Sequence, residues 1–144
     1  MNIDACHSSN DHDWETPTAL FSELDAEFGF TLDPCATMET AKCARYFTEA
    51  DDGLVQSWVG EIVFCNPPYG RAIRHWVKKA WDEAGCGATV ALLIPARTDT
   101  SYWHDYCFRG EVRFLRGRVR FKRGDKTGPA PFPSAVVIFC PRNL

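Results

Sequence analysis

Long apolar runs are missing from this sequence: within its 144 residues, none approaches the roughly 20 residues that cross a bilayer. Its N-terminal residues lack the basic region and the apolar stretch of a signal peptide, so we expect a cytoplasmic protein without a membrane partner. Internal repeats and linker-like segments are also missing. We therefore expect a polar, disordered tail over residues 1–13 and a single folded domain over residues 14–144.

Metal-binding and disulfide patterns are missing as well. The seven cysteines are scattered and form no C-x-x-C pair, and the four histidines show no ligand spacing with them. An odd number of scattered cysteines argues against a disulfide framework and against a zinc site, so we expect no metal. The glycine-rich fingerprint that holds dinucleotide phosphates in α/β folds is missing too, which favours a nucleoside cofactor without phosphates.

Positive charge is scarce overall but concentrated in one segment. The net charge is -3, yet residues 109–126 carry eight basic residues against two acidic ones, a net charge of +6 that leaves -9 for the rest of the chain. A basic segment on an acidic body predicts binding of a polyanion such as a nucleic acid. The alternative is a solvated hairpin whose arginines keep a sheet edge soluble.

The most informative motif is Asn66-Pro67-Pro68-Tyr69, which follows the apolar run 61–64 and precedes Gly70. Two consecutive prolines cannot continue a central strand, so the motif lies at a strand's carboxyl end, where open α/β sheets bind ligands. The Asn66 side chain and the Pro67 carbonyl offer two acceptors for an exocyclic NH₂ group, and Tyr69 offers a ring for stacking. The motif predicts a clamp for an amino group on a flat ring. The alternative is a Pro-Pro turn or a polyproline segment that binds a partner.

A second polar group follows an earlier predicted strand. Asp33 and Pro34 close a short apolar run, and Asp51 and Asp52 lie 18 and 19 residues after Asp33. This is near the spacing at which α/β nucleotide folds place an acid on the ribose of a cofactor. The alternative is that Asp33 caps a helix and that Asp51 and Asp52 lie in a solvated loop.

The order of predicted elements indicates an α/β fold. Periodicity and turn residues predict helices over 17–28, 71–84 and 103–108 with a short one within 35–44, and strands over 30–33, 46–48, 61–65, 89–94, within 111–121 and over 135–139. Thr16 is expected to cap the first helix, with Pro17 at its first position and Gly29 at its end. Residues 122–134 are expected to form a loop. The sheet should be mainly parallel with an antiparallel C-terminal hairpin, and its early half should be shortened, because only 28 residues separate Asp33 from residue 61.

Taken together, these motifs resemble the phage-type DNA N6-adenine methyltransferases, the Dam-like group. The resemblance covers residues 14 to about 140 and is carried by the segments 14–17, 28–36, 52–54, Trp58, 66–70 and 94–100. It implies a Rossmann-like, S-adenosylmethionine-dependent methyltransferase fold, S-adenosylmethionine as cofactor, DNA as partner and a location in the cytoplasm of a host bacterium.

The resemblance also implies roles for individual residues. The catalytic motif is Asn66, Pro67 and Tyr69, with Pro68 as a rigid spacer. The cofactor contacts are Trp14, Thr16, Pro17, Asp33, Pro34, Asn66 and Asp52, with Asp51 as the alternative to Asp52. The DNA contacts are Arg97, Arg116, Arg118, Arg120, Lys122 and Arg123, with Phe121 supporting the target base. Two departures are the missing Phe-x-Gly-x-Gly cofactor loop and the missing target-recognition domain, so target sequence and oligomeric state do not follow from this chain.

Two other functions fit the same residues. A methyltransferase fold without catalytic activity would bind nucleic acid through residues 109–126. An amino-methyltransferase acting on RNA or on protein glutamine would use the same clamp, because a glutamine amide also presents an NH₂ group.

Overall fold

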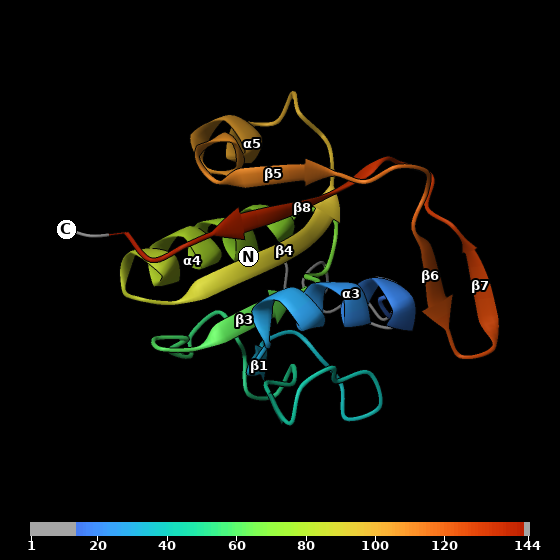
Figure 1. Ribbon diagram of the computed structural model, residues 1–144, viewed down its shortest axis with the longest axis horizontal. Helices are drawn as coiled ribbons and strands as arrows, with labels where there is room; N and C mark the ends of the chain where they lie inside the picture. Colours follow the sequence, from blue (N-terminus) through green and yellow to red (C-terminus); the bar gives the residue numbers. More distant parts are fainter. Residues whose placement is uncertain (1–13, 143–144) are drawn as a thin grey trace.

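A mixed α/β sheet forms the centre of the computed structural model, which describes residues 14–142 (Figure 1). Within these residues the sheet has six strands in the order β2-β1-β3-β4-β8-β5. Their bounds are β1 Leu32–Asp33, β2 Arg45–Tyr46, β3 Ile62–Cys65, β4 Thr89–Pro95, β5 Glu111–Phe114 and β8 Ser134–Phe139. The first four strands in this order are parallel, and β8 pairs antiparallel with both β4 and β5. The predicted mainly parallel sheet with an antiparallel C-terminal pair is confirmed.

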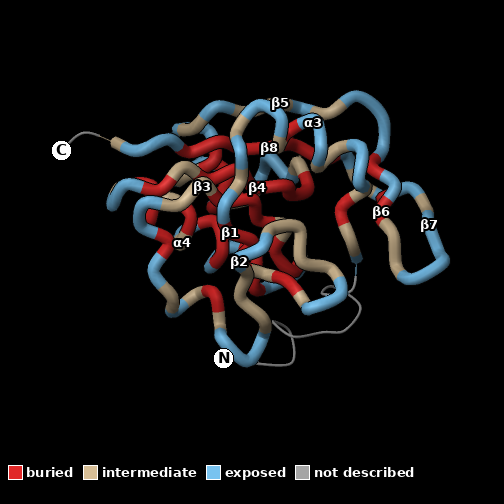
Figure 2. Tube along the Cα trace, turned by 60° about the horizontal axis from the view of Figure 1, so that its bottom comes forward, coloured by how far each residue is buried: buried red, intermediate tan, exposed pale blue. Residues whose placement is uncertain are grey.

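Both faces of the sheet are covered, which explains why β4 is an almost continuous apolar run. Side chains alternate along the strand: Val90, Leu92 and Ile94 join the cluster on the face of helix α4 (Ile73–Gly85), and Ala91 and Leu93 join the opposite cluster. All five are fully buried, and the buried trace runs along the central strands (Figure 2). Helix α3 (Thr18–Phe28) packs on the opposite face through Leu24 and its aromatic residues.

The short helical region after β4 differs slightly from expectation. Instead of one helix over 103–108, the chain forms α5 (Ser101–Asp105) and a 3-10 turn, η1 (Cys107–Arg109). Trp103 anchors this region because its indole is fully buried and its N–H donates to the Pro95 carbonyl at 3.2 Å.

A two-stranded hairpin stands apart from the main sheet and extends away from the body of the protein (Figure 1). Strands β6 (Arg120–Arg123) and β7 (Lys126–Pro129) pair antiparallel around a two-residue turn, Gly124-Asp125. Gly124 has φ 60°, the left-handed conformation that such tight turns require. The prediction of a loop over 122–134 was therefore wrong for residues 122–123, 126–129 and 134, which lie in β6, β7 and β8. We call residues 116–129 the basic arm.

The early half of the sheet is short, as expected, but residues 35–44 form turns and no helix. The Asp33 carboxylate accepts the Lys42 N–H at 3.0 Å and the Cys35 N–H at 3.4 Å, and the hydroxyls and N–H groups of Thr37 and Thr40 bond to one another. Such local side-chain bonds to the backbone compete with helix formation, which is why the predicted helix was wrong.

The start of α3 also differs from the prediction. Pro17 takes the N-cap position, the helix begins at Thr18, and no side chain caps it. The end was predicted correctly: Gly29 has φ 68°, and its N–H donates to the Asp25 carbonyl at 2.8 Å. The tail predicted over residues 1–13 lies outside the described residues. Among the residues described, no helix has the length and apolar character to cross a membrane.

Candidate active site

Three polar residues predicted from the sequence gather at one edge of the sheet. Asp33 ends β1, Asn66 directly follows β3, and Arg97 follows β4 by two residues. These strands are adjacent and parallel, so their carboxyl ends meet at the same edge. Asp33 and Asn66 line one narrow recess of about 20 Å³, together with Trp14, Thr16 and Lys42. We call it the Asp33 recess.

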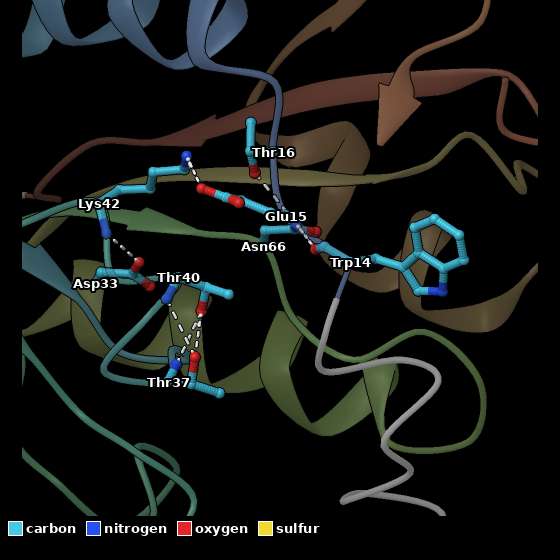
Figure 3. Close-up of polar contacts among 8 residues, drawn as sticks. All are labelled: Trp14, Glu15, Thr16, Asp33, Thr37, Thr40, Lys42 and Asn66. Atoms are coloured by element: carbon cyan, nitrogen blue, oxygen red, sulfur yellow. Dashed lines mark hydrogen bonds and ion pairs between the residues drawn. The ribbon is translucent and has the colours of Figure 1, made fainter. Parts of the chain in front are cut away.

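The orientation of the Asn66 amide is determined by its neighbours (Figure 3). Its Nδ2 donates to the Trp14 carbonyl at 3.3 Å and to Thr16 Oγ1 at 3.2 Å. Because a backbone carbonyl can only accept, the atom facing Trp14 must be the amide nitrogen. Asn66 Oδ1 therefore points away from the segment 14–16 and accepts the Tyr69 hydroxyl at 2.8 Å. The hydroxyl of Thr16, predicted to cap a helix, instead positions this amide.

Tyr69 is anchored at its hydroxyl, which lies 2.8 Å from Asn66 Oδ1 and 3.0 Å from the Leu93 carbonyl. One proton serves both acceptors, so Asn66 Oδ1 keeps capacity to accept from a ligand. Burial raises the pKa of Tyr69 well above its usual value, so the phenol stays a neutral donor. No described hydrogen bond within residues 14–142 uses the Pro67 carbonyl, the second acceptor of the predicted clamp.

A cavity of about 530 Å³ opens beside this anchored pair. Phe121 and Phe132 contact the Tyr69 ring edge to face, at centroid distances of 6.1 Å and 5.6 Å. The Arg97 guanidinium lies over the Phe132 ring at 5.6 Å. The lining residues are Trp14, Asn66, Tyr69, Gly70, Arg97, Phe121 and residues 128–132. We call this cavity the aromatic pocket; its volume is typical of ligand pockets, about 300–1,000 Å³.

Asp33 is a buried carboxylate with two backbone hydrogen bonds. It is 4% exposed, and burial raises its pKa to about 7, against the lowering effect of the Lys42 and Cys35 N–H groups. Burial therefore favours its protonated form, and a cationic group placed beside it would favour the charged form. The Lys42 ammonium is itself paired with the Glu15 carboxylate at 2.7 Å.

The loop after β2 distinguishes the two candidate acids. Asp51 uses its carboxylate locally, accepting the Thr48 N–H at 2.9 Å and the Thr48 hydroxyl at 3.1 Å. Asp52 lines a small recess beside Pro34 and is the one non-glycine residue with positive φ, 56°, in the described part of the chain. A Cβ on Gly53 would lie 2.1 Å from the Pro34 carbonyl oxygen, so only glycine lets the loop approach this closely. The Asp52 carboxylate also has a local partner, since its Oδ1 accepts the Leu54 N–H at 3.1 Å, but of the two acids Asp52 is the one that lines the recess beside Pro34.

The basic segment predicted over 109–126 is not one surface. Arg113 binds both carboxylate oxygens of Glu27 at 2.7 Å and also pairs with Glu111, and the Arg109 guanidinium lies over Trp81 at 5.8 Å. The prediction that residues 109–126 form one basic segment for a polyanion is therefore wrong at its N-terminal end.

The remaining basic residues belong to the basic arm, which carries six of them against Asp125, a net charge of +5. They are Arg116, Arg118, Arg120, Lys122, Arg123 and Lys126. Phe121 of the arm is buried and lines the aromatic pocket. The Arg118 guanidinium donates to the Ala130 carbonyl at 3.4 Å, and the Arg123 guanidinium lies over the Trp14 ring at 5.9 Å.

Sequence reasoning missed three residues of this region. Glu15 pairs through its backbone with Lys122 and through its carboxylate with Lys42. Phe132 forms a wall of the aromatic pocket. The one sequence feature that could have indicated Phe132 is its position as a lone aromatic residue between Pro131 and Pro133. Nothing in the local sequence indicates Glu15 or Lys42. No group of three or more metal-ligating side chains is placed to hold a metal ion within residues 14–142.

An Asn-Pro-Pro-Tyr motif and a buried acid lie at the ends of neighbouring parallel strands, as the sequence led us to expect of a methyltransferase. Comparisons with known proteins support the methyltransferase class. An alignment over 63 residues, which covers 39% of this chain and 69% of the relative, shows 36% identity to the "Putative methyltransferase YfdM" of Escherichia coli (strain K12). The family model described as "DNA N-6-adenine-methyltransferase (Dam)" matches residues 5–141. The chain belongs to this Dam family, which confirms the resemblance seen in the sequence.

Proposed function

We propose that the protein transfers the methyl group of S-adenosylmethionine to N6 of adenine in DNA, in the cytoplasm of a bacterial host. One observation carries the proposal: Asn66, with its amide orientation determined, lines both the aromatic pocket and the Asp33 recess. An amine held in the first space is therefore adjacent to a donor held in the second.

On the adenine side, the chain offers a clamp and an apolar enclosure. Asn66 Oδ1 and the Pro67 carbonyl accept the two N6 hydrogens, which leaves the nitrogen lone pair free to react. The adenine ring is surrounded by the aromatic side chains of Tyr69, Phe121 and Phe132. These contacts offset part of the cost of taking a base out of the stack, which is roughly a few kcal/mol. The Tyr69 hydroxyl keeps its bond to the Leu93 carbonyl, so a ligand amine does not displace the ring.

On the donor side, the residues fit S-adenosylmethionine by their chemistry. The cofactor carries a sulfonium, an ammonium group and ribose hydroxyls, and the chain presents the buried Asp33 and the strained Asp52 on either side of Pro34. Trp14 and Thr16 also line the Asp33 recess, and Pro17 follows them directly in the chain. The recess holds about 20 Å³, so cofactor binding requires the segments 14–17 and 35–42 around it to separate. When bound, the cofactor supplies a methyl group on a positively charged sulfur.

The protein's contribution to rate is positioning. Asn66 is neutral and a poor base, so the N6 proton leaves to water after transfer. Holding the amine and the donor in line supplies most of the acceleration, because the sulfonium is already reactive. The basic arm and Arg97 bind phosphates, which makes affinity fall steeply with salt.

Methyl transfer from labelled cofactor to DNA tests the proposal. We expect label on adenine N6, and we expect Asn66→Ala to lower the rate by about 100-fold or more while the matched surface variant Lys78→Ala keeps it. RNA and glutamine-containing peptides, offered in the same assay, reveal whether the acceptor is another amine. The proposal is wrong if no DNA receives methyl on adenine, or if Asn66→Ala matches the wild type.

A further inference from the structure

A second hollow lies beside the aromatic pocket, between the start of α4 and the start of α5. Its volume is about 550 Å³, close to that of the aromatic pocket. The lining residues are Gly70, Arg71, Ile73, Arg74, Thr100, Ser101 and Tyr102. We call it the arginine hollow. None of the roles assigned above uses it.

The arginine hollow offers hydrogen-bond donors and positive charge, and its lining contains no carboxylate. Arg71 and Arg74 are exposed, and neither forms an ion pair with another residue in the described part of the chain. Arg74 lies in the first turn of α4 and Arg71 directly precedes the N-cap residue Ala72, and both line the hollow. Thr100 already donates its hydroxyl to the Arg97 carbonyl at 2.7 Å, which leaves Ser101 as a further donor. Such a set suits an anion with several oxygens and excludes a cation.

Two turns connect the arginine hollow to the aromatic pocket. Gly70, at φ 109°, lines both spaces and directly follows the Asn-Pro-Pro-Tyr motif. Arg97 lines the aromatic pocket and Thr100 lines the hollow, and the Thr100 N–H donates to the Arg97 carbonyl at 3.1 Å. A ligand that fills the aromatic pocket can therefore continue into the hollow. The hollow shares no lining residue with the Asp33 recess, which separates it from the cofactor side.

We propose that the arginine hollow binds the phosphodiester backbone of the strand that carries the target adenine, at a phosphate next to the nucleotide in the aromatic pocket. This inference rests on the proposed function. A base that leaves the stack pulls its flanking phosphates with it, and arginine and hydroxyl donors are the groups that hold phosphates in register. The basic arm borders the aromatic pocket through Phe121 and residues 128–129, so the hollow adds a phosphate contact on another side of the same pocket.

A charge-matched pair of variants tests the inference. Arg71→Gln/Arg74→Gln removes two charges from the hollow, and Arg45→Gln/Lys78→Gln removes two exposed charges elsewhere. We expect the first variant to weaken DNA binding by about tenfold or more near physiological salt and to lower the slope of log affinity against log salt by about 1 to 2. The control should change neither quantity by more than about twofold. Cofactor affinity should be unchanged in both variants.

Neutral phosphates locate the contact on the DNA. Methylphosphonates are placed one at a time along the target strand, and wild-type affinity should fall at one or two phosphates beside the target adenine. In the variant Arg71→Gln/Arg74→Gln, the same methylphosphonates should cause no further loss of affinity. The phosphates that they replace have already lost their arginine partners in this variant.

The outcomes separate this inference from the proposed function. If the wild type methylates adenine but the double variant matches its control in affinity and salt slope, the inference is wrong and the function stands. If only cofactor affinity falls, the hollow belongs to the cofactor and the inference is wrong. If the wild type binds DNA through Arg71 and Arg74 but transfers no methyl group, the proposed function fails and the phosphate contact stands. Absence of any DNA binding overturns both.

Discussion

Glu15 and Lys122 pair through their backbones in both directions: the Glu15 N–H donates to the Lys122 carbonyl at 2.7 Å, and the Lys122 N–H donates to the Glu15 carbonyl at 3.0 Å. This joins the segment 14–16 to strand β6 of the basic arm. The same segment holds the Asn66 amide through Trp14 and Thr16, and the Glu15 carboxylate holds Lys42 beside Asp33 (Figure 3). Residues 14–16 therefore contact the basic arm, the Asn66 amide and the proposed cofactor site at once.

The role of Thr16 as the holder of Asn66 is testable by an isosteric change. Thr16→Val removes the hydroxyl that accepts Asn66 Nδ2 and leaves the amide tethered to the Trp14 carbonyl alone. We expect kcat to fall by about 3- to 10-fold, the worth of one hydrogen bond, with DNA affinity unchanged. Thr16→Ser keeps the hydroxyl and should restore the rate. Equal rates for Thr16→Val and wild type would show that the bond does not position the amide.

The Tyr69 hydroxyl is expected to matter separately from its ring. Tyr69→Phe keeps the aromatic surface but removes the bonds to Asn66 Oδ1 and the Leu93 carbonyl. We expect the free energy of unfolding to fall by about 1 kcal/mol and kcat to fall several-fold. Tyr69→Ala should reduce activity much further, because the ring is lost as well. Denaturant unfolding and steady-state kinetics measure the two effects, and a Tyr69→Phe variant with unchanged values would contradict the anchoring role.

The stability of the free protein should depend on pH through Asp33. Its folded pKa, about 7, lies above its ordinary value of 3.8, so the folded state binds this proton more tightly than the unfolded chain does. The contribution of the neutral carboxyl is complete below about pH 4 and is lost as the pH rises to about 7, a change on the order of a few kcal/mol. Asp33→Asn should lose this dependence, so its unfolding free energy relative to wild type should increase from pH 5 to pH 8.

The control for this experiment is Asp82→Asn, which changes an exposed carboxylate of α4. Its unfolding free energy should follow the wild-type pH dependence. The same two variants test the cofactor contact: wild-type affinity for S-adenosylmethionine should rise with pH through about 7, and Asp33→Asn should bind weakly at every pH. A wild-type pH profile identical to that of Asp33→Asn would rule out a buried, titrating Asp33.

The close approach of the loop 48–53 to Pro34 should make Gly53 intolerant of a side chain. A Cβ there would lie 2.1 Å from the Pro34 carbonyl oxygen and 3.1 Å from the Trp76 ring, so the loop must shift and move Asp52. We expect Gly53→Ala to destabilise the fold by about 1–3 kcal/mol and to weaken cofactor binding. Gly128→Ala, where the added Cβ meets nothing within 4 Å, is the control for stability. A fully stable Gly53→Ala variant would show that the loop is not held against Pro34.

Local sequence was enough for the central elements and for the position of the clamp. Residues 90–94 are continuously apolar because both faces of β4 are covered, and Pro67 and Pro68 end the pairing of β3 because proline lacks an N–H. Gly29 ends α3 because it adopts a left-handed conformation. Each of these features is recognisable from the residue itself and from its near neighbours along the chain.

Contacts between distant residues decided the rest. Thr16 accepts a hydrogen bond from Asn66, 50 positions away, and no sequence periodicity predicts that contact. Arg113 pairs with Glu27, 86 positions away, and so does not share a surface with the rest of the basic segment. Phe132 lines the aromatic pocket only because the chain returns from the basic arm to β8. Asp52 is distinguished from Asp51 by a loop held against Pro34. The sequence by itself determined where the proposed reacting groups lie along the chain. Only the tertiary structure decided which partners orient them, because orientation depends on atoms that packing brings together.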